Sequence, residues 1–304
     1  MDLSVVVAMV SDTMESPNTI HLEPCLAALA KQSLGGTVEI VVPHLPSVEG
    51  MAQLRQQYPD VRFLEVSDLR TYKGRSGSRE HHDELRARGL AAARGRIVAL
   101  IEDCGIPASD WCARIIEGHE KPAAALGGAI ENGVDRPLNW AVYFCDFLRY
   151  QNPLPEGEAA TASDANVSYK RVALEAIRPV WQESFHESSV NSALLAKGEK
   201  LAAAPEIVAW QHRLGLSLIQ AVKERFVWGR SYAATRAKAA NPRLRLFWTV
   251  FTPLLPVLIM ARMTLMAWRK KRTMGAFLKA LPLTIVLTVG WCCGELTGYV
   301  SGRA

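Results

Sequence analysis

The chain has 304 residues, of which 49% are hydrophobic and 21% are charged, and this composition is ordinary for a globular protein. The net charge of +5 is unevenly distributed. Residues 243–304 contain nine Lys or Arg and one acid, a net charge of +8, so residues 1–242 carry −3. Because the basic residues lie in the most apolar part of the chain, the pattern favours an anionic membrane surface, and not a nucleic acid polymer, as the partner.

The six cysteines form no C-x-x-C pair and have no metal-binding spacing. We therefore expect all six to be reduced thiols in a cytoplasmic setting. The first residues lead directly into an apolar run from Leu3 to Val10, with no basic segment of the kind that opens a signal peptide. The N-terminal domain is accordingly expected to be made and kept in the cytoplasm.

The first 133 residues alternate between strand and helix patterns. Strands are predicted at residues 3–10, 37–43, 61–66, 97–101 and within 121–133, and helices at 24–32, 51–58 and 83–94. Strand–helix–strand repetition with short connections is typical of a mostly parallel, doubly wound α/β sheet. We predict that this domain occupies residues 1–215.

Two carboxylates, Glu102 and Asp103, directly follow the apolar strand 97–101, and Gly105 and Pro107 then mark a turn. Open α/β sheets bind their ligands at the carboxyl ends of the strands. Carboxylates at such a place can hold a divalent cation, which can in turn hold a diphosphate. The alternative interpretation is a solvated acidic turn.

Three other clusters have plainer interpretations. HHDE (81–84) has metal-binding residue types, but a solvated helix start is favoured. The Gly/Ser/Arg-rich segment 74–79 has the composition of a phosphate contact, but it lacks the P-loop pattern, which argues against an ATPase. The aromatic residues between Trp140 and Tyr150 are expected to pack against the flank of the sheet.

The C-terminal part is predicted to be membrane-associated. Residues 216–242 form a mixed basic and aromatic helix that either lies flat at a bilayer interface or caps the domain. Residues 243–304 contain two apolar stretches, 246–261 and 280–294, separated by the basic segment 268–272. Both are shorter than the roughly 20 residues of a spanning helix. A re-entrant or interfacial hairpin, two true spans and a soluble helical cap remain open.

Five segments, in this order along the chain, resemble the family 2 glycosyltransferases of the GT-A fold. They are LSVVVAMV (3–10), RARGLAAARGRIVALIEDCGIP (86–107), ALGGAIENG (125–133), SDANVSYKRVAL (163–174) and FHESSVNSALLAKGEKLAAAP (185–205). The likeness covers residues 3–232 well, and RFVWGRSY (225–232) and GELTGY (294–299) resemble membrane-associated members. It implies inverting transfer of a sugar from a nucleotide-diphosphate donor, usually with Mg²⁺ or Mn²⁺.

The resemblance also implies site residues. The family's D-x-D metal motif corresponds to Glu102, Asp103 and Cys104, so Asp103 is the expected ligand, beside Glu102, and the second acid is replaced by a thiol, a poor ligand for Mg²⁺. The family's general base corresponds to Glu187, with Glu183 in reserve. The alternative for Glu187 is an acid that only favours a helix N-terminus.

Further roles follow from the same resemblance. Asp164 and Asn166 match a segment in which side chains bind donor or acceptor hydroxyls. His212 takes the place of a His that reaches the metal or diphosphate, with a surface-loop His as the alternative. The family's nucleotide-binding acids are missing after the second strand, where Pro43 and His44 stand. Asp68 or Glu65, near the end of the third strand, is the expected substitute, and the alternative is that backbone groups hold the donor base.

The sequence therefore predicts a glycosyltransferase on the cytoplasmic face of a bacterial-type inner membrane. It would transfer a sugar to a lipid-linked or polysaccharide-precursor acceptor. One alternative is a polyprenyl-phosphate glycosyltransferase, whose acceptor is the lipid phosphate itself. A second alternative is a catalytically degenerate GT-A domain that acts as a membrane-bound binding protein.

Overall fold

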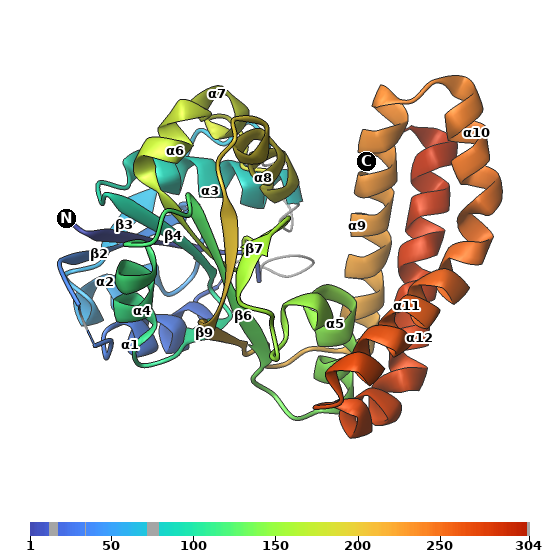
Figure 1. Ribbon diagram of the computed structural model, residues 1–304, viewed down its shortest axis with the longest axis horizontal. Coiled ribbons are helices and arrows are strands. Elements are labelled where there is room, and N and C mark those ends of the chain that lie inside the picture. Colours follow the sequence, from blue (N-terminus) through green and yellow to red (C-terminus); the bar gives the residue numbers. More distant parts are fainter. Residues whose placement is uncertain (12–17, 34, 72–78, 303–304) are drawn as a thin grey trace. The chain divides into compact units, whose positions relative to one another are not determined.

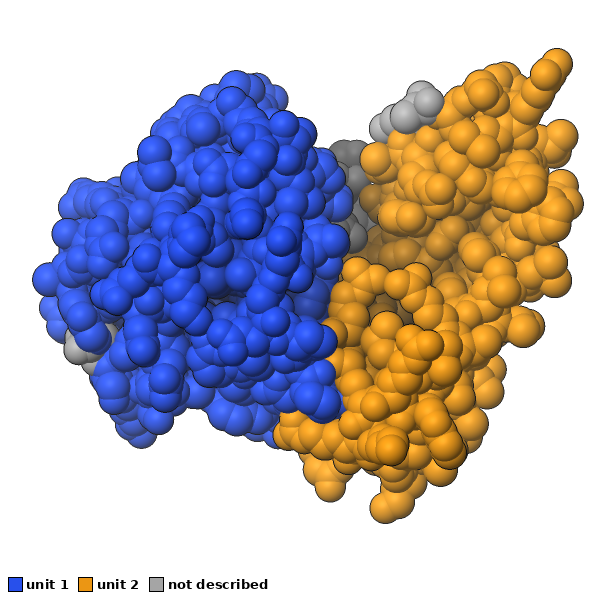
Figure 2. Space-filling model, in the orientation of Figure 1, with its two compact units in different colours: residues 1–133, 150–213 blue, residues 134–149, 214–304 orange. Residues whose placement is uncertain are grey.

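The computed structural model describes residues 1–11, 18–33, 35–71 and 79–302. The predicted α/β fold with a C-terminal helical hairpin is confirmed (Figure 1). Contacts divide the chain into two compact units, which are coloured separately in Figure 2. Unit 1 comprises residues 1–133 and 150–213, and unit 2 comprises residues 134–149 and 214–304.

Unit 1 is built on one mixed sheet of nine strands within the described residues. They are β1 (Leu3–Ala8), β2 (Val38–His44), β3 (Arg62–Glu65), β4 (Ile97–Glu102), β5 (Gly105–Pro107), β6 (Ala125–Asn132), β7 (Gly157–Ala159), β8 (Asn166–Lys170) and β9 (Leu201–Gln211). Their order is β3-β2-β1-β4-β8-β6-β9-β5, and β7 also pairs with β9. Strands β1 to β4 are mutually parallel, and β8 runs antiparallel to β4 and β6. Because β6 and β9 run parallel to each other, most of the sheet shares one direction, as predicted.

Helices cover both faces of this sheet. They are α1 (Leu22–Leu29), α2 (Met51–Gln57), α3 (Arg79–Ala92), α4 (Trp111–Gly118), α6 (Arg171–Ala176), α7 (Arg178–Trp181) and α8 (Glu187–Ala196). Alternate residues of a strand point to opposite faces. Thus Val5 and Val7 of β1 pack in the core with α1, α2 and α4, whereas Val6 packs with α3 and α6 to α8. The apolar run of β1 is therefore explained by burial on both sides.

The start of α3 differs from the prediction. His81, His82, Asp83 and Glu84 are all buried, with at most 4% of each residue exposed, so the expected solvated helix start is wrong. The physical reason is that the connection into α8 covers this turn, and the main-chain N of Phe185 donates a hydrogen bond to Asp83 O at 2.9 Å. The neighbouring segment 74–78 lies outside the described residues.

Unit 2 is helical. It contains α5 (Pro137–Asp146), α9 (Leu218–Ala239), α10 (Pro242–Phe251), the short 3₁₀ helix η2 (Thr252–Leu254), α11 (Leu255–Lys270) and α12 (Met274–Ser301); a second 3₁₀ helix, η1 (Leu148–Tyr150), follows α5. The continuous helical stretches 242–270 and 274–301 are 29 and 28 residues long, and both are long and apolar enough to cross a membrane by length and composition. The two apolar stretches of the sequence are therefore the central parts of longer helices.

Helices α9 and α12 approach each other through glycines. A Cβ atom at Gly294 would collide with the carbonyl oxygen of Phe226, and one at Gly298 would collide with that of Arg230. A Cβ atom at Gly229 of α9 would likewise collide with the carbonyl oxygen of Trp291. Small residues at such spacing allow two helix backbones to pack closely.

The aromatic residues of α5 also differ from the prediction. Trp140 stacks on Phe144 with ring centroids 5.3 Å apart, and Phe144 meets Phe277 of α12 edge to face at 5.1 Å. They pack within unit 2, so their expected place on the flank of the sheet is wrong. Periodicity alone reveals an apolar helix face but does not identify its partner.

Candidate active site

The candidate site lies at the carboxyl ends of β1 and β4. Because these strands are parallel and Ala8 is paired with Glu102, the chain after β1 meets the chain after β4 at this edge. The main-chain N of Asp103 donates to Ala8 O at 2.9 Å, which fixes the turn after β4. The sheet thus places Glu102 and Asp103 where open α/β sheets bind ligands.

Asp103 is completely buried, and its carboxylate is held by the protein. Its Oδ1 accepts hydrogen bonds from the main-chain N of Val10 at 3.2 Å and of Cys104 at 3.1 Å. Its Oδ2 accepts a hydrogen bond from the hydroxyl of Ser11. The side chain therefore ties the end of β4 to the segment after β1, and the alternative of a solvated acidic turn is wrong.

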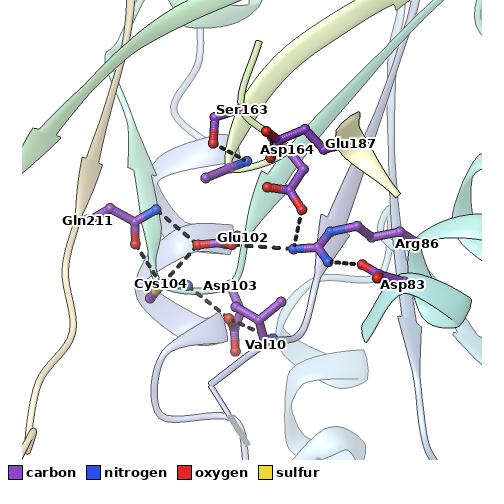
Figure 3. Close-up of polar contacts among 11 residues, drawn as sticks. Val10, Asp83, Arg86, Glu102, Asp103, Cys104, Ser163, Asp164, Glu187 and Gln211 are labelled. Carbon is purple, nitrogen blue, oxygen red and sulfur yellow. Dashed lines mark hydrogen bonds and ion pairs between the residues drawn. The ribbon is translucent and has the colours of Figure 1, made fainter. Parts of the chain in front are cut away.

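Arg86 of α3 is the cation at the centre of the site (Figure 3). Its Nη1 lies 3.0 Å from Asp83, and its Nη2 lies 3.3 Å from Glu102 and 3.1 Å from Asp164. Only 5% of its side chain is exposed. Burial alone would lower the pKa of Arg86, but the charges of the surrounding carboxylates, led by Asp164, outweigh it and raise the pKa above the ordinary value.

Glu187 is joined to the same cluster. It is the first residue of α8, and its Oε2 accepts a hydrogen bond from the main-chain N of Asp164 at 3.4 Å. Because Asp164 pairs with Arg86, and Arg86 with Glu102, the predicted base and the acidic turn belong to one connected set of polar side chains. Glu102 and Glu187 are 85 positions apart in the sequence, and the fold connects them (Figure 3).

Glu102 has a second set of contacts on its other side. Gln211, the last residue of β9, donates from Nε2 to Glu102 at 3.1 Å and accepts a contact from the Cys104 thiol at 2.9 Å. Burial, together with the nearby charge of Asp164, raises the pKa of Glu102 from 4.5 to about 7, although Arg86 opposes the shift. Burial also raises the pKa of Cys104, so this residue is a neutral thiol at pH 7.

Asn166 is fixed by the protein itself. Its Nδ2 donates to Ala129 O at 2.8 Å and to Ile207 O at 2.9 Å, and its Oδ1 accepts from the indole of Trp111 at 2.9 Å. Only 1% of the residue is exposed. These contacts join β6, β8, β9 and α4, and we therefore leave Asn166 out of the proposed ligand-binding residues.

His212 borders the turn through its main chain, because its N donates to Cys104 O at 2.7 Å. Its side chain lines a shallow hollow together with Lys31, which follows α1, Ile106 of β5 and Trp210. Trp210 is 38% exposed there. The structure thus places the His212 side chain among mostly apolar neighbours.

Asp68 and Glu183 take part in a second group of ion pairs on the surface. Asp68 is paired with Arg88 at 3.1 Å, and Glu183 is paired with Arg70 at 3.4 Å. Both arginines also approach the buried Glu84, each at 3.7 Å. The Asp68 and Glu183 side chains are 69% and 71% exposed, which is far more than those of Glu102 and Asp164 at 14% each.

The contacts of the acidic turn determine whether the expected divalent cation fits there. Both carboxylate oxygens of Asp103 are bonded to protein donors, Glu102 is bonded to Arg86 and Gln211, and Cys104 is a thiol. Among the residues that the structure describes, no three His, Cys, Asp or Glu side chains are grouped to hold a metal ion. The predicted ligands Asp103 and His212, as placed here, do not fit a metal site.

Three residues of the site were missed by the sequence analysis. Arg86 and Asp83 lie one turn apart on α3, and the cluster that contains Asp83 was interpreted as solvated. An arginine facing the sheet from an Ala- and Leu-rich helix was the available signal. Gln211 gave no signal, because its contact with Glu102 depends on the pairing of β9 with β5 and β6.

No protein-family model and no curated protein matches the chain. Similar solved structures include the mannosyltransferase PcManGT from Pyrobaculum calidifontis in complex with GDP-Man and Mn²⁺. That chain is 15% identical with a TM-score of 0.49, and the match covers 99% of this chain and 85% of that one. Another is S. aureus TarS 1-349 in complex with UDP, which is 12% identical with a TM-score of 0.46 over 96% and 91% of the two chains.

Proposed function

We propose that the protein is an inverting glycosyltransferase that uses a nucleotide-diphosphate sugar and works at a membrane surface. The observation that carries the proposal is the connected cluster Glu102–Arg86–Asp164–Glu187 at the carboxyl ends of β1 and β4. It joins Glu187, the base that the family resemblance implies, to Glu102, the neighbour of the implied ligand Asp103. A lipid-linked or polysaccharide-precursor acceptor is favoured, because a membrane concentrates such acceptors beside the enzyme.

Glu187 would act as the general base. It would take the proton from the acceptor hydroxyl while that oxygen forms a bond to the anomeric carbon. The bond from this carbon to the diphosphate breaks at the same time, so the nucleoside diphosphate leaves and the anomeric configuration inverts. The main-chain N of Asp164 donates a hydrogen bond to Glu187, and the Asp164 side chain is held in turn by Arg86.

The proposal is tested by donor turnover. Purified protein is assayed for hydrolysis and transfer of UDP- and GDP-linked sugars, with Mn²⁺ and with EDTA, and for thermal stabilisation by the same donors. We expect the Glu187→Gln variant to lose turnover by about 100-fold or more and to keep donor binding, since only the proton transfer is removed. Glu183→Gln is the matched control, because this exposed acid is paired with Arg70 on the surface, and it should keep near wild-type turnover.

Each other outcome has a defined meaning. Loss of turnover in Glu183→Gln with normal rates in Glu187→Gln would move the base to Glu183. Donor binding without turnover in any condition would favour a degenerate domain that only binds. If no donor binds or reacts, the proposed function is wrong.

A further inference from the structure

Helices α10 and α11, joined by η2, form an arm whose outer face is apolar and has little cover from the rest of unit 2. In the most apolar window of 242–270, only 6% is buried, compared with 33% for the corresponding window of α12. The exposed side chains form a continuous series around η2: Phe247 at 54%, Val250 at 61%, Phe251 at 47%, Leu254 at 55%, Val257 at 69% and Leu258 at 62%. An exposed apolar surface of this kind marks an interaction site.

The charges on the arm are of one sign. From residue 243 to residue 294 the sequence has no Asp or Glu. Exposed basic residues stand at both ends, Arg243 at the start of α10 and Arg269, Lys271 and Arg272 at the end of α11. Lys and Arg near a membrane surface are attracted to anionic lipid headgroups. Apolar side chains flanked by basic ones therefore fit a bilayer that contains anionic phospholipid.

The positive charge at both ends argues against a crossing. The 29 residues of 242–270 would extend about 44 Å at about 1.5 Å per residue. If this stretch crossed a bilayer, basic residues would be left on both sides, whereas Lys and Arg normally remain on the cytoplasmic side. If the arm lies in the plane of the membrane, both ends meet the same headgroup layer, and Arg262 can extend its head to that layer as well.

Helix α12 is also unsuited to cross a membrane alone. It lies between α9 and α11 (Figure 1). The contacts at Gly294 and Gly298 pack the C-terminal half of α12 against α9. Helix α9 carries six charged residues, and the Arg225 side chain is paired with Asp146 of α5. A crossing α12 would take Arg225 and Arg230 into the hydrocarbon, which is costly.

We propose that the α10–η2–α11 arm lies in the plane of one leaflet of an anionic phospholipid bilayer, with its apolar face among the acyl chains and both basic ends on lipid phosphates. Neither the arm nor α12 crosses the membrane, and α9 stays on the aqueous side. The proposal depends on the membrane association included in the proposed function. It adds that the partner is anionic phospholipid and that the lipid contacts the apolar face of the arm.

The test uses full-length protein added to preformed vesicles of phosphatidylglycerol and phosphatidylcholine. Cysteines are introduced one at a time as Arg243→Cys, Lys271→Cys and Leu258→Cys, in a Cys293→Ser background, because Cys293 is the exposed native thiol within the described residues. A membrane-impermeant maleimide is added before and after lysis with detergent. Lys223→Cys on α9, which is exposed, is the aqueous control.

We expect residues 243 and 271 to be labelled fully before lysis, as residue 223 is, and residue 258 to be labelled only after lysis. If residue 243 or residue 271 were labelled only after lysis, that end would lie across the membrane, and the proposal would be overturned. Labelling of residue 258 before lysis would show that the face does not enter the membrane, and would also overturn it. None of these outcomes depends on sugar transfer, so donor turnover tests the enzymatic proposal separately.

Discussion

At the scale of single residues, Arg86 supplies the buried positive charge among the five acids at one edge of the sheet. It is buried and makes close contacts with Asp83, Glu102 and Asp164, while Asp103 is satisfied by main-chain donors. Removing one partner of a buried ion pair leaves uncompensated charge in a medium of low polarity. Arg86 therefore holds the candidate site together, whatever reaction takes place there.

We expect the Arg86→Gln variant to lose about 3 kcal/mol of unfolding free energy, as is typical when a buried ion pair is broken. Urea unfolding of the wild-type and variant proteins in the same detergent measures the difference. The control is Arg114→Gln, whose partner Asp110 is 46% exposed, and no measurable loss is expected there. Equal stability of Arg86→Gln and wild type would contradict the role given to Arg86.

The pH dependence of stability should report Glu102. Because burial and Asp164 raise its pKa in the folded protein to about 7, the folded state holds this proton more tightly than the unfolded chain, where the value is near 4.5. The contribution of Glu102 to stability is fully present below about pH 4.5, and it is lost as the pH rises from there through about 7.

We expect the Glu102→Gln variant to lack this component. The unfolding free energy of the wild type should fall more steeply than that of the variant between pH 4.5 and 7, measured by urea unfolding at a series of pH values. Parallel curves for the two proteins would show that Glu102 does not titrate in this range.

At the scale of elements, the sequence identified strands β1 to β4 and β6 and helices α1 to α3 and α9, but it did not identify strands β5 and β7 to β9 or helices α4 to α8. The apolar runs of β1 and β4 predicted a parallel sheet, because burial on both faces requires such runs. The identity of the α5 partner was missed, since an aromatic helix face packs equally well on a sheet or on another helix. The same limit applied to α3, whose polar first turn is buried by the segment around Phe185, 102 positions after Asp83.

Glycines in α12 give a test at this scale. We expect the Gly294→Ala variant to destabilise unit 2 by about 1–3 kcal/mol, because the added methyl collides with the backbone of α9. Gly275→Ala is the control within the same helix, where the added methyl meets nothing within 4 Å, and alanine favours helix by up to about 1 kcal/mol. Thermal unfolding followed by circular dichroism measures both. A more stable Gly294→Ala variant would contradict the close packing of α9 on α12.

At the scale of the whole molecule, charge is divided along the chain, with −3 on residues 1–242 and +8 on residues 243–304. The excess positive charge and the exposed apolar arm lie in the same C-terminal segment. Electrostatic attraction to lipid is screened by salt, whereas burial of apolar surface is not.

We therefore expect high salt to weaken binding to anionic vesicles without abolishing it. Flotation of full-length protein with such vesicles at low salt and at about 1 M salt, where the Debye length is about 3 Å, measures the retained fraction. Vesicles of neutral lipid are the control and should bind less protein at low salt. Complete release at high salt would show that the apolar face does not insert.

The sequence by itself determined the alternation of strands and helices, the acidic end of β4 and the basic, apolar C-terminal segment, because each depends on residues close together in the chain. Only the tertiary structure decided that Arg86 occupies the centre of the acids, that Gln211 reaches Glu102, and that Asp164 connects to Glu187. It also decided that α12 is covered by α9 while α10 and α11 remain exposed. These contacts join distant segments, and their formation depends on strand order and helix packing, which local patterns do not encode.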